Sequence, residues 1–198
     1  MMDIVSIMTE ASDVNQRVAR AVHRLRRARG LSLEALAARS GVSRSMISLV
    51  ERGEASATAV VLEKLATGLD VALASLFDEP AAAAGPVARH ADQTTWRDPG
   101  SGYLRRNVSP AGYPSPIRIV DVEFPPLARV AYETADRDTP VHQQVWVRDG
   151  EVEVTVGDDV HRLGEGDCVA FELDRPVVFH NPGERPARYA VVLVSARA

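Results

Sequence analysis

Residues 33–52 (LEALAARSGVSRSMISLVER) carry hydroxyl and guanidinium side chains in the spacing of two short helices around a glycine-centred turn. The second helix is predicted to begin at Ser43 and to present small polar residues and Arg44 outward. Such side chains can hydrogen-bond to base edges or phosphates. Apolar residues stand where the helix pair must bury them, at Leu36, Ala37, Val42, Ile47 and Val50. The pattern is typical of a helix-turn-helix, whose second helix enters the major groove of DNA.

The helices around this run are predicted from apolar spacing and capping residues. Val18, Val22 and Leu25 repeat at spacings of four and three, which indicates an amphipathic helix over residues 14–29. Residues 1–13 are expected to form a loose leader. Hydroxyl residues at Ser32, Ser43 and Thr58 can cap the helices that follow them. With a last helix over residues 72–77, five helices are predicted to form a compact all-helical domain.

The second half of the chain shows the alternation of half-buried strands. Val152, Val154 and Val156 alternate with polar residues, as one covered sheet face requires. Nine short strands are predicted, over residues 103–108, 117–124, 127–133, 142–148, 151–156, 160–163, 168–172, 177–181 and 187–195. This spacing is typical of a β-sandwich or barrel. The fold class is therefore α+β with two domains, the first all-helical and the second all-β.

Residues 79–100 are predicted to link the two domains. The segment EPAAAAGPVAR at residues 79–89 has two prolines, a glycine and an alanine run without apolar periodicity. A short helical extension is the alternative, because alanine is the best helix former. The prolines at both ends favour the linker.

Charge distribution separates the two halves. The 198 residues carry a net charge of −4, with ten basic and nine acidic residues in 1–78 but thirteen and eighteen in 79–198. The acidic half would repel phosphates, so DNA binding is expected from the first half. Cys168 is the single cysteine, which excludes an intrachain disulfide and a cysteine-based metal cluster. No long apolar run or signal pattern is found, so we expect a cytoplasmic protein without a membrane partner.

Residues 17–78, with the motif at 33–52, resemble the XRE-type (lambda-repressor-like) helix-turn-helix domain. The resemblance is carried by RARGLSLEALAARSGVSRSMISLVERGE and LEKLATGLDVALASLF. It implies that Arg26 and Glu51 form an ion pair between the first and third helices. The DNA-contacting residues that it implies are Ser43, Arg44, Ser45, Ser48, Leu49 and Arg52.

The implied roles of these DNA-contacting residues differ. Arg44 is the candidate for a bidentate contact with guanine, with a phosphate contact as the alternative. Ser43 is equally consistent with helix capping alone. Leu49 can contact a thymine methyl group, and Arg52 can contact the DNA backbone.

Residues 101–198 resemble the cupin family, a double-stranded β-helix or small jelly roll, on HQQVWVRDGEVEVTVGD and LGEGDCVAFELDRPVVFHNPGERPARYAVVLV. Many cupins bind a divalent metal through two histidines and a glutamate on one motif and a third histidine on the other. The matching positions here are residues 136–139, Gln143 and Val177, which include neither histidine nor glutamate. His142 and His180 are out of register, and a one-residue shift in a strand turns a side chain to the opposite face. We therefore expect no metal, no cofactor and no enzymatic activity.

The predicted barrel could still hold a small ligand. The candidates for lining residues are Tyr132, Gln143, Phe171 and Phe179, with ordinary core packing as the alternative for each. In the strand 142–148, the predicted interior residues are Gln143, Val145 and Val147, and the predicted outer residues are His142, Gln144 and Trp146. Cys168 is expected to be a buried small hydrophobic residue.

Together, the two resemblances imply a sequence-specific transcriptional regulator with a C-terminal cupin domain. It would bind a pseudo-palindromic double-stranded operator as a homodimer, with the cupin half sensing a small molecule, mediating dimerisation, or both. One alternative is a cupin enzyme tethered to DNA. Another is a module that uses its β-domain to dock a partner protein.

Overall fold

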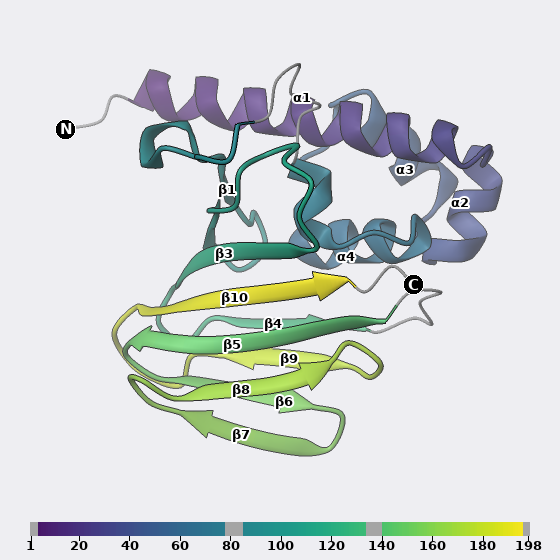
Figure 1. The fold of residues 1–198 in the computed structure, drawn as a ribbon. Helices are drawn as coiled ribbons and strands as arrows, with labels where there is room; N and C mark the ends of the chain where they lie inside the picture. The colour runs from purple at the N-terminus through teal and green to yellow at the C-terminus, as the bar shows by residue number, and fades with distance from the viewer. Residues whose placement is uncertain (1–3, 78–84, 134–139, 196–198) are drawn as a thin grey trace.

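The structure is a computed structural model that describes residues 4–77, 85–133 and 140–195, with side chains from residue 13 to residue 194. A helical layer lies across one end of a β-sandwich (Figure 1). The first part of the predicted linker and the positions 136–139 of the cupin comparison lie outside the described residues. Within the described residues, no helix is both long and apolar enough to cross a bilayer.

The helical half contains four α-helices in the described part of the chain. They are α1 (Ile4–Ala28), α2 (Leu33–Ser40), α3 (Arg44–Glu51) and α4 (Ala59–Gly68). The fifth predicted helix is instead a short 3-10 helix, η1 (Leu73–Phe77), so the prediction of five α-helices is not confirmed. The expected loose leader is wrong from residue 4 onward, because α1 already begins at Ile4.

The three predicted caps are confirmed. The hydroxyls of Ser32, Ser43 and Thr58 each accept a hydrogen bond from the backbone N–H three residues later. The donors are Ala35, Met46 and Val61. Gly41 has a φ of 67°, a left-handed conformation that ends α2 and starts the turn to α3. Local side-chain chemistry thus fixes where the two motif helices begin and end.

The strands form two antiparallel sheets, as expected for a β-sandwich. The larger sheet has the order β1-β2-β3-β10-β5-β8, and the smaller has the order β4-β9-β6-β7. The larger sheet contains β1 (Thr95–Arg97), β2 (Leu104–Asn107), β3 (Ile117–Phe124), β10 (Ala187–Ser195), β5 (Val141–Asp149) and β8 (Cys168–Glu172). The smaller contains β4 (Arg129–Tyr132), β9 (Val177–His180), β6 (Val152–Val156) and β7 (Asp159–Leu163).

Alternation along the central strands agrees with the sequence. In β5, Gln143, Val145 and Val147 are buried, whereas the residues between them are exposed, including half-exposed Trp146. Cys168 contradicts its predicted burial, because it is exposed. Cys168 pairs with Trp146 of β5, so its side chain lies on the same outer, exposed face of the sheet.

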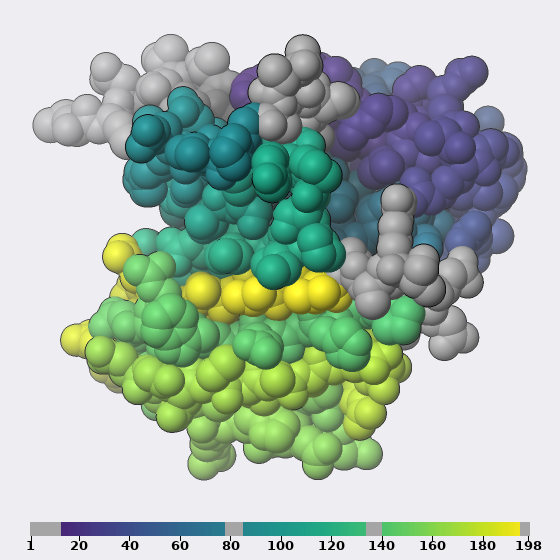
Figure 2. All heavy atoms as spheres, viewed as in Figure 1, coloured from purple at the N-terminus to yellow at the C-terminus, as the bar shows by residue number. Residues whose placement is uncertain are grey.

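A β-hairpin joins the helical half to the sandwich. Its first strand, β1, and a short 3-10 helix η2 (His90–Asp92) both lie within residues 79–100. Trp96 of β1 packs between Phe77 and Tyr103, with ring centroids 5.4 and 5.9 Å away. Figure 2 shows this teal segment beside the purple helices and above the strands of the sandwich. The two halves are therefore packed against each other through a shared aromatic cluster.

Candidate nucleic-acid interface

α3 is held with one face buried and the other exposed. Ile47 and Val50 are 0% and 2% exposed and pack in the core of the helical half. Ser43, Arg44 and Ser45, at the N-terminal end of the helix, are exposed. This is the end that a recognition helix presents to base edges.

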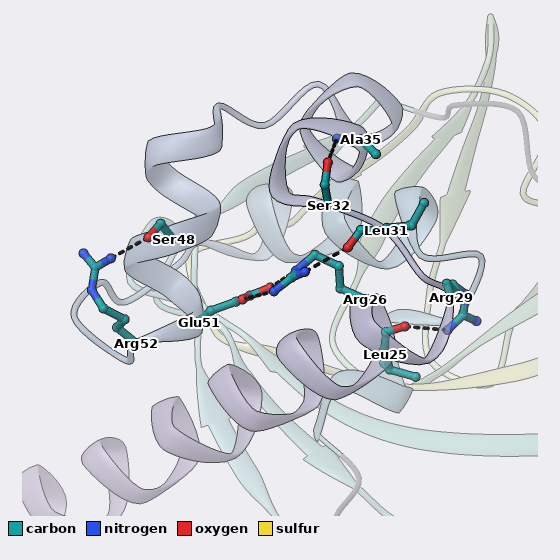
Figure 3. A network of polar contacts seen from close by, with 9 residues as sticks. All are labelled: Leu25, Arg26, Arg29, Leu31, Ser32, Ala35, Ser48, Glu51 and Arg52. Atoms are coloured by element: carbon teal, nitrogen blue, oxygen red, sulfur yellow. Dashed lines mark hydrogen bonds and ion pairs between the residues drawn. The ribbon is translucent and has the colours of Figure 1, made fainter.

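The ion pair between Arg26 and Glu51 fixes α3 on α1, as predicted. Arg26 Nε and Nη2 donate to the two carboxylate oxygens of Glu51 at 2.6 and 2.8 Å (Figure 3). Arg26 Nη1 also donates to the carbonyl of Leu31 at 2.8 Å, in the loop that precedes α2. The hydrogen bond to Glu51 is the main cause that raises the pKa of Arg26. One guanidinium therefore ties together α1, α3 and the start of the motif.

Arg44 lies at the exposed end of α3 and pairs with Glu34 of α2. Arg44 Nε donates to Glu34 Oε1, and both side chains are 64% exposed. A hydrogen bond from its own backbone lowers the pKa of the Glu34 carboxyl, and the hydrogen bond from Arg44 lowers it further. Because exposed ion pairs contribute little to stability, Arg44 can exchange this partner for DNA at small cost.

The remaining predicted contact residues fall into two groups. Ser43 and Ser45 lie at the start of α3, where their hydroxyl oxygens are 3.1 Å apart and Ser43 also caps the helix. Ser48 accepts a hydrogen bond from Arg52, which also pairs with Glu54 at 2.7 Å. Figure 3 shows Ser48 and Arg52 on the side of α3 away from Arg26. Leu49 is half-buried, and its apolar side chain forms no hydrogen bond.

A second candidate site is a cavity between the two sheets. Its volume is about 70 Å³, and it opens to solvent. Tyr132, Gln143 and Phe179 line it, as the sequence analysis proposed, whereas Phe171 is not among its lining residues. Burial is the main cause that raises the pKa of the Tyr132 and Tyr189 hydroxyls well above the usual value, so both are neutral at physiological pH.

Sequence reasoning missed two functional candidates, Arg105 and Asp98. Arg105 on β2 is 7% exposed and lines the cavity. The sequence feature that could have identified it is its position two residues after Tyr103, because strand alternation places both side chains on the same face. Asp98, 3% exposed, lies in the hairpin turn and accepts a hydrogen bond from Ala59 N at 2.8 Å. No local pattern predicts a partner that is 39 residues away.

The two described residues at the cupin metal positions, Gln143 and Val177, do not fit a metal. Gln143 and Val177 both line the cavity, and neither offers a carboxylate or an imidazole. His142 is exposed on the opposite face of β5, and His180 Nδ1 lies 3.9 Å from a carboxylate oxygen of Glu153 on β6. Within the described part of the chain, no three His, Cys, Asp or Glu residues are grouped as metal ligands would be.

Comparisons with known proteins match both halves separately. A helix-turn-helix family model matches residues 22–76, and a cupin-domain model matches residues 124–194. The HTH-type transcriptional regulator SutR of Escherichia coli K12 is 27% identical over 165 residues, which cover 83% of this chain and 87% of SutR.

Two solved structures are similar to the chain. A crystal structure of an HTH_3 family transcriptional regulator from Vibrio cholerae has a TM-score of 0.76 and 23% identity, and the match covers 94% of this chain and 99% of that one. The cupin domain of an XRE family transcriptional regulator from Enterobacter cloacae has a TM-score of 0.44 and 19% identity, over 48% of this chain and 98% of that one. The first of these shows that the fold of both halves together occurs in another protein.

Proposed function

The chain belongs to the XRE-type helix-turn-helix proteins that carry a C-terminal cupin domain, and from this premise we propose that α3 reads a specific operator. The observation that carries the proposal is the fixed and open placement of α3. Its inner face is held by Ile47 and by the Glu51 ion pair, and its outer N-terminal end is exposed. A rigid helix with exposed polar side chains is what base readout requires.

Replacing Arg44 with alanine tests the readout. We expect the loss of about 1–3 kcal/mol of binding free energy at one base position, with relaxed specificity there. The measurement is selection of bound DNA sequences at a defined salt concentration, followed by affinities for single-base operator variants. Uniform weakening on every variant would assign Arg44 to a phosphate and contradict base readout.

Two further variants serve as controls for Arg44. Glu34→Gln removes the partner of Arg44 but keeps the guanidinium, so affinity should stay equal or rise. Arg52→Ala, at the other end of α3, should weaken binding to all operator variants alike, because a backbone contact carries no sequence information.

The cupin half is proposed to hold two copies together. Recognition helices one DNA turn apart, about 34–36 Å, require a two-fold dimer on a pseudo-palindromic operator. The outer face of the larger sheet exposes apolar side chains that the chain itself does not cover, namely Ile117, Ile119 and Trp146 at 45%, 37% and 50%. Strands β3, β10 and β5 bring them onto one face, as the pairing of Val192 with Ile119 and of Ala190 with Trp146 shows.

Trp146→Asp tests this dimer. A charge at the centre of an apolar interface is unfavourable, so the variant should be monomeric where the parent is dimeric, and its affinity for a two-half-site operator should fall. Sedimentation or light scattering measures the mass. The matched control is Val160→Asp on β7, 55% exposed and in the other sheet, which should remain dimeric. A dimeric Trp146→Asp protein would rule out this face.

The cavity between the sheets supports the remaining part of the proposal, that the cupin half senses a small molecule. A ligand can shift operator affinity only by its differential affinity for the two states of the protein. The lining of the cavity supports this role, because Glu63 of α4 and Leu73 of η1 belong to its wall. An occupant would therefore contact both the β-sandwich and the helical half.

A further inference from the structure

We propose that the cavity binds a small monocarboxylate with a flat apolar body, and that Arg105 is its anion anchor. This inference rests on the proposed sensing function and names the chemical class of the effector. It is carried by one buried cation that has no ion-pair partner in the described ranges of the chain, and by the aromatic walls around it. Neither feature contributes to DNA recognition by α3.

Arg105 is buried, and none of the carboxylates that the structure describes forms an ion pair with it. Its Nε donates to Asn107 Oδ1 at 3.3 Å, and its guanidinium carbon lies 5.3 Å from the centre of the Phe77 ring. Its buried Nη2 makes no hydrogen bond to any residue that the structure describes. An unpaired buried charge is costly, and a planar guanidinium matches the two oxygens of a carboxylate. A bound carboxylate would therefore satisfy Arg105.

Aromatic side chains form the apolar part of the site. Phe179 and Tyr189 stack with ring centroids 5.7 Å apart, and Phe124 meets the edge of Tyr189 at 6.0 Å. A flat apolar ligand suits walls made of ring faces and edges. The hydroxyls of Tyr103 and Tyr132 lie 3.2 Å apart, so these two tyrosines already serve each other as hydrogen-bond partners.

The acidic residues of the cavity restrict the charge of the ligand. Glu63 and Glu133 also line it. Glu133 pairs with Lys64 at 2.6 Å, so its charge is largely compensated. Glu63, on α4, is the second carboxylate in the wall. One anchoring cation beside these carboxylates favours a single negative charge over a dianion such as phosphate.

The position of Arg105 connects the cavity to the helical half. Its guanidinium packs on Phe77 of η1, and Asn107 Nδ2 donates to the carbonyl of Ala74 in the same 3-10 helix at 3.5 Å. Leu73 of η1 lines the cavity. A ligand bound to Arg105 would therefore also contact η1, the element that follows α4. We infer that this contact couples the cavity to the DNA-binding half.

The test uses benzoate as the probe on the full-length protein, measured by calorimetric titration. Benzoate should bind, benzamide of the same shape should bind at least about tenfold more weakly, and phosphate should not compete. Arg105→Gln should weaken the affinity for benzoate at least about tenfold and leave benzamide binding nearly unchanged. The matched control is Arg106→Gln on the same strand, which should keep benzoate binding.

The outcomes separate this inference from the proposed function. Two results overturn the anion anchor. One is equal binding of benzoate and benzamide. The other is that neither benzoate nor the aliphatic probe hexanoate binds. If Arg105→Gln fails to fold, Arg105→Lys keeps the charge without the planar fork and should still weaken benzoate binding. Benzoate binding without any change in operator affinity leaves the site standing and overturns its sensing role. Absence of operator preference in the parent protein overturns the regulator proposal alone.

Discussion

Arg26→Ala is expected to destabilise the helical half by about 3–5 kcal/mol, because it leaves the Glu51 carboxylate buried without its partner. The two side chains are only 12% and 9% exposed, so water cannot replace the lost hydrogen bonds fully. The change also removes the hydrogen bond to the carbonyl of Leu31. Urea unfolding followed by circular dichroism measures the loss. Operator binding should fall in parallel, because α3 is no longer fixed on α1.

Two variants make this prediction specific. The double variant Arg26→Met with Glu51→Leu replaces both charges by apolar groups and should recover most of the lost stability. Arg52→Ala removes the arginine that follows Glu51 at the end of α3, but its ion pair is exposed, so the unfolding midpoint should hardly move. If Arg26→Ala unfolds at the same urea concentration as Arg52→Ala, the buried pair does not hold the motif together.

Asp98→Ala is expected to cost about 3 kcal/mol and to loosen the junction between the two halves. Asp98 Oδ1 accepts from Ala59 N at 2.8 Å, and Oδ2 accepts from the N–H and the hydroxyl of Ser101, both at 2.7 Å. The carboxylate also lies at the N-terminus of α4, where a negative charge is favourable. Its removal leaves buried N–H groups without acceptors.

Hydrogen exchange of the first amides of α4, together with urea unfolding, measures the effect of Asp98. Asp98→Asn retains an acceptor for Ala59 N but not the charge, so it should recover part of the stability. Thr58→Ala removes only the local cap of the same helix, whose bond to Val61 N is long at 3.4 Å, and should cost less than Asp98→Ala. An Asp98→Ala protein with unchanged exchange at Ala59 would show that the hairpin does not support α4.

The sequence by itself determined the features that depend on near neighbours. Helix caps join residues three positions apart, and strand alternation has a period of two, so Ser43 and the inward side of β5 were predictable. The Arg26–Glu51 pair was predicted from the resemblance rather than from spacing. The type of η1 was not predicted, because a short apolar segment supports either helix geometry.

Only the tertiary structure decided which charges are buried and what they meet. Asp98 and Ala59 are distant in sequence, and the fold of the hairpin against α4 brings them together. The sequence does not distinguish Arg105 from the other arginines of the strands. In the fold, its guanidinium lies over the Phe77 ring and its side chain lines the cavity. Cys168 was expected to be buried, yet its pairing with Trp146 places it on the exposed outer face of the sheet. Burial and pairing are properties of how elements pack, and no short stretch of sequence contains that information.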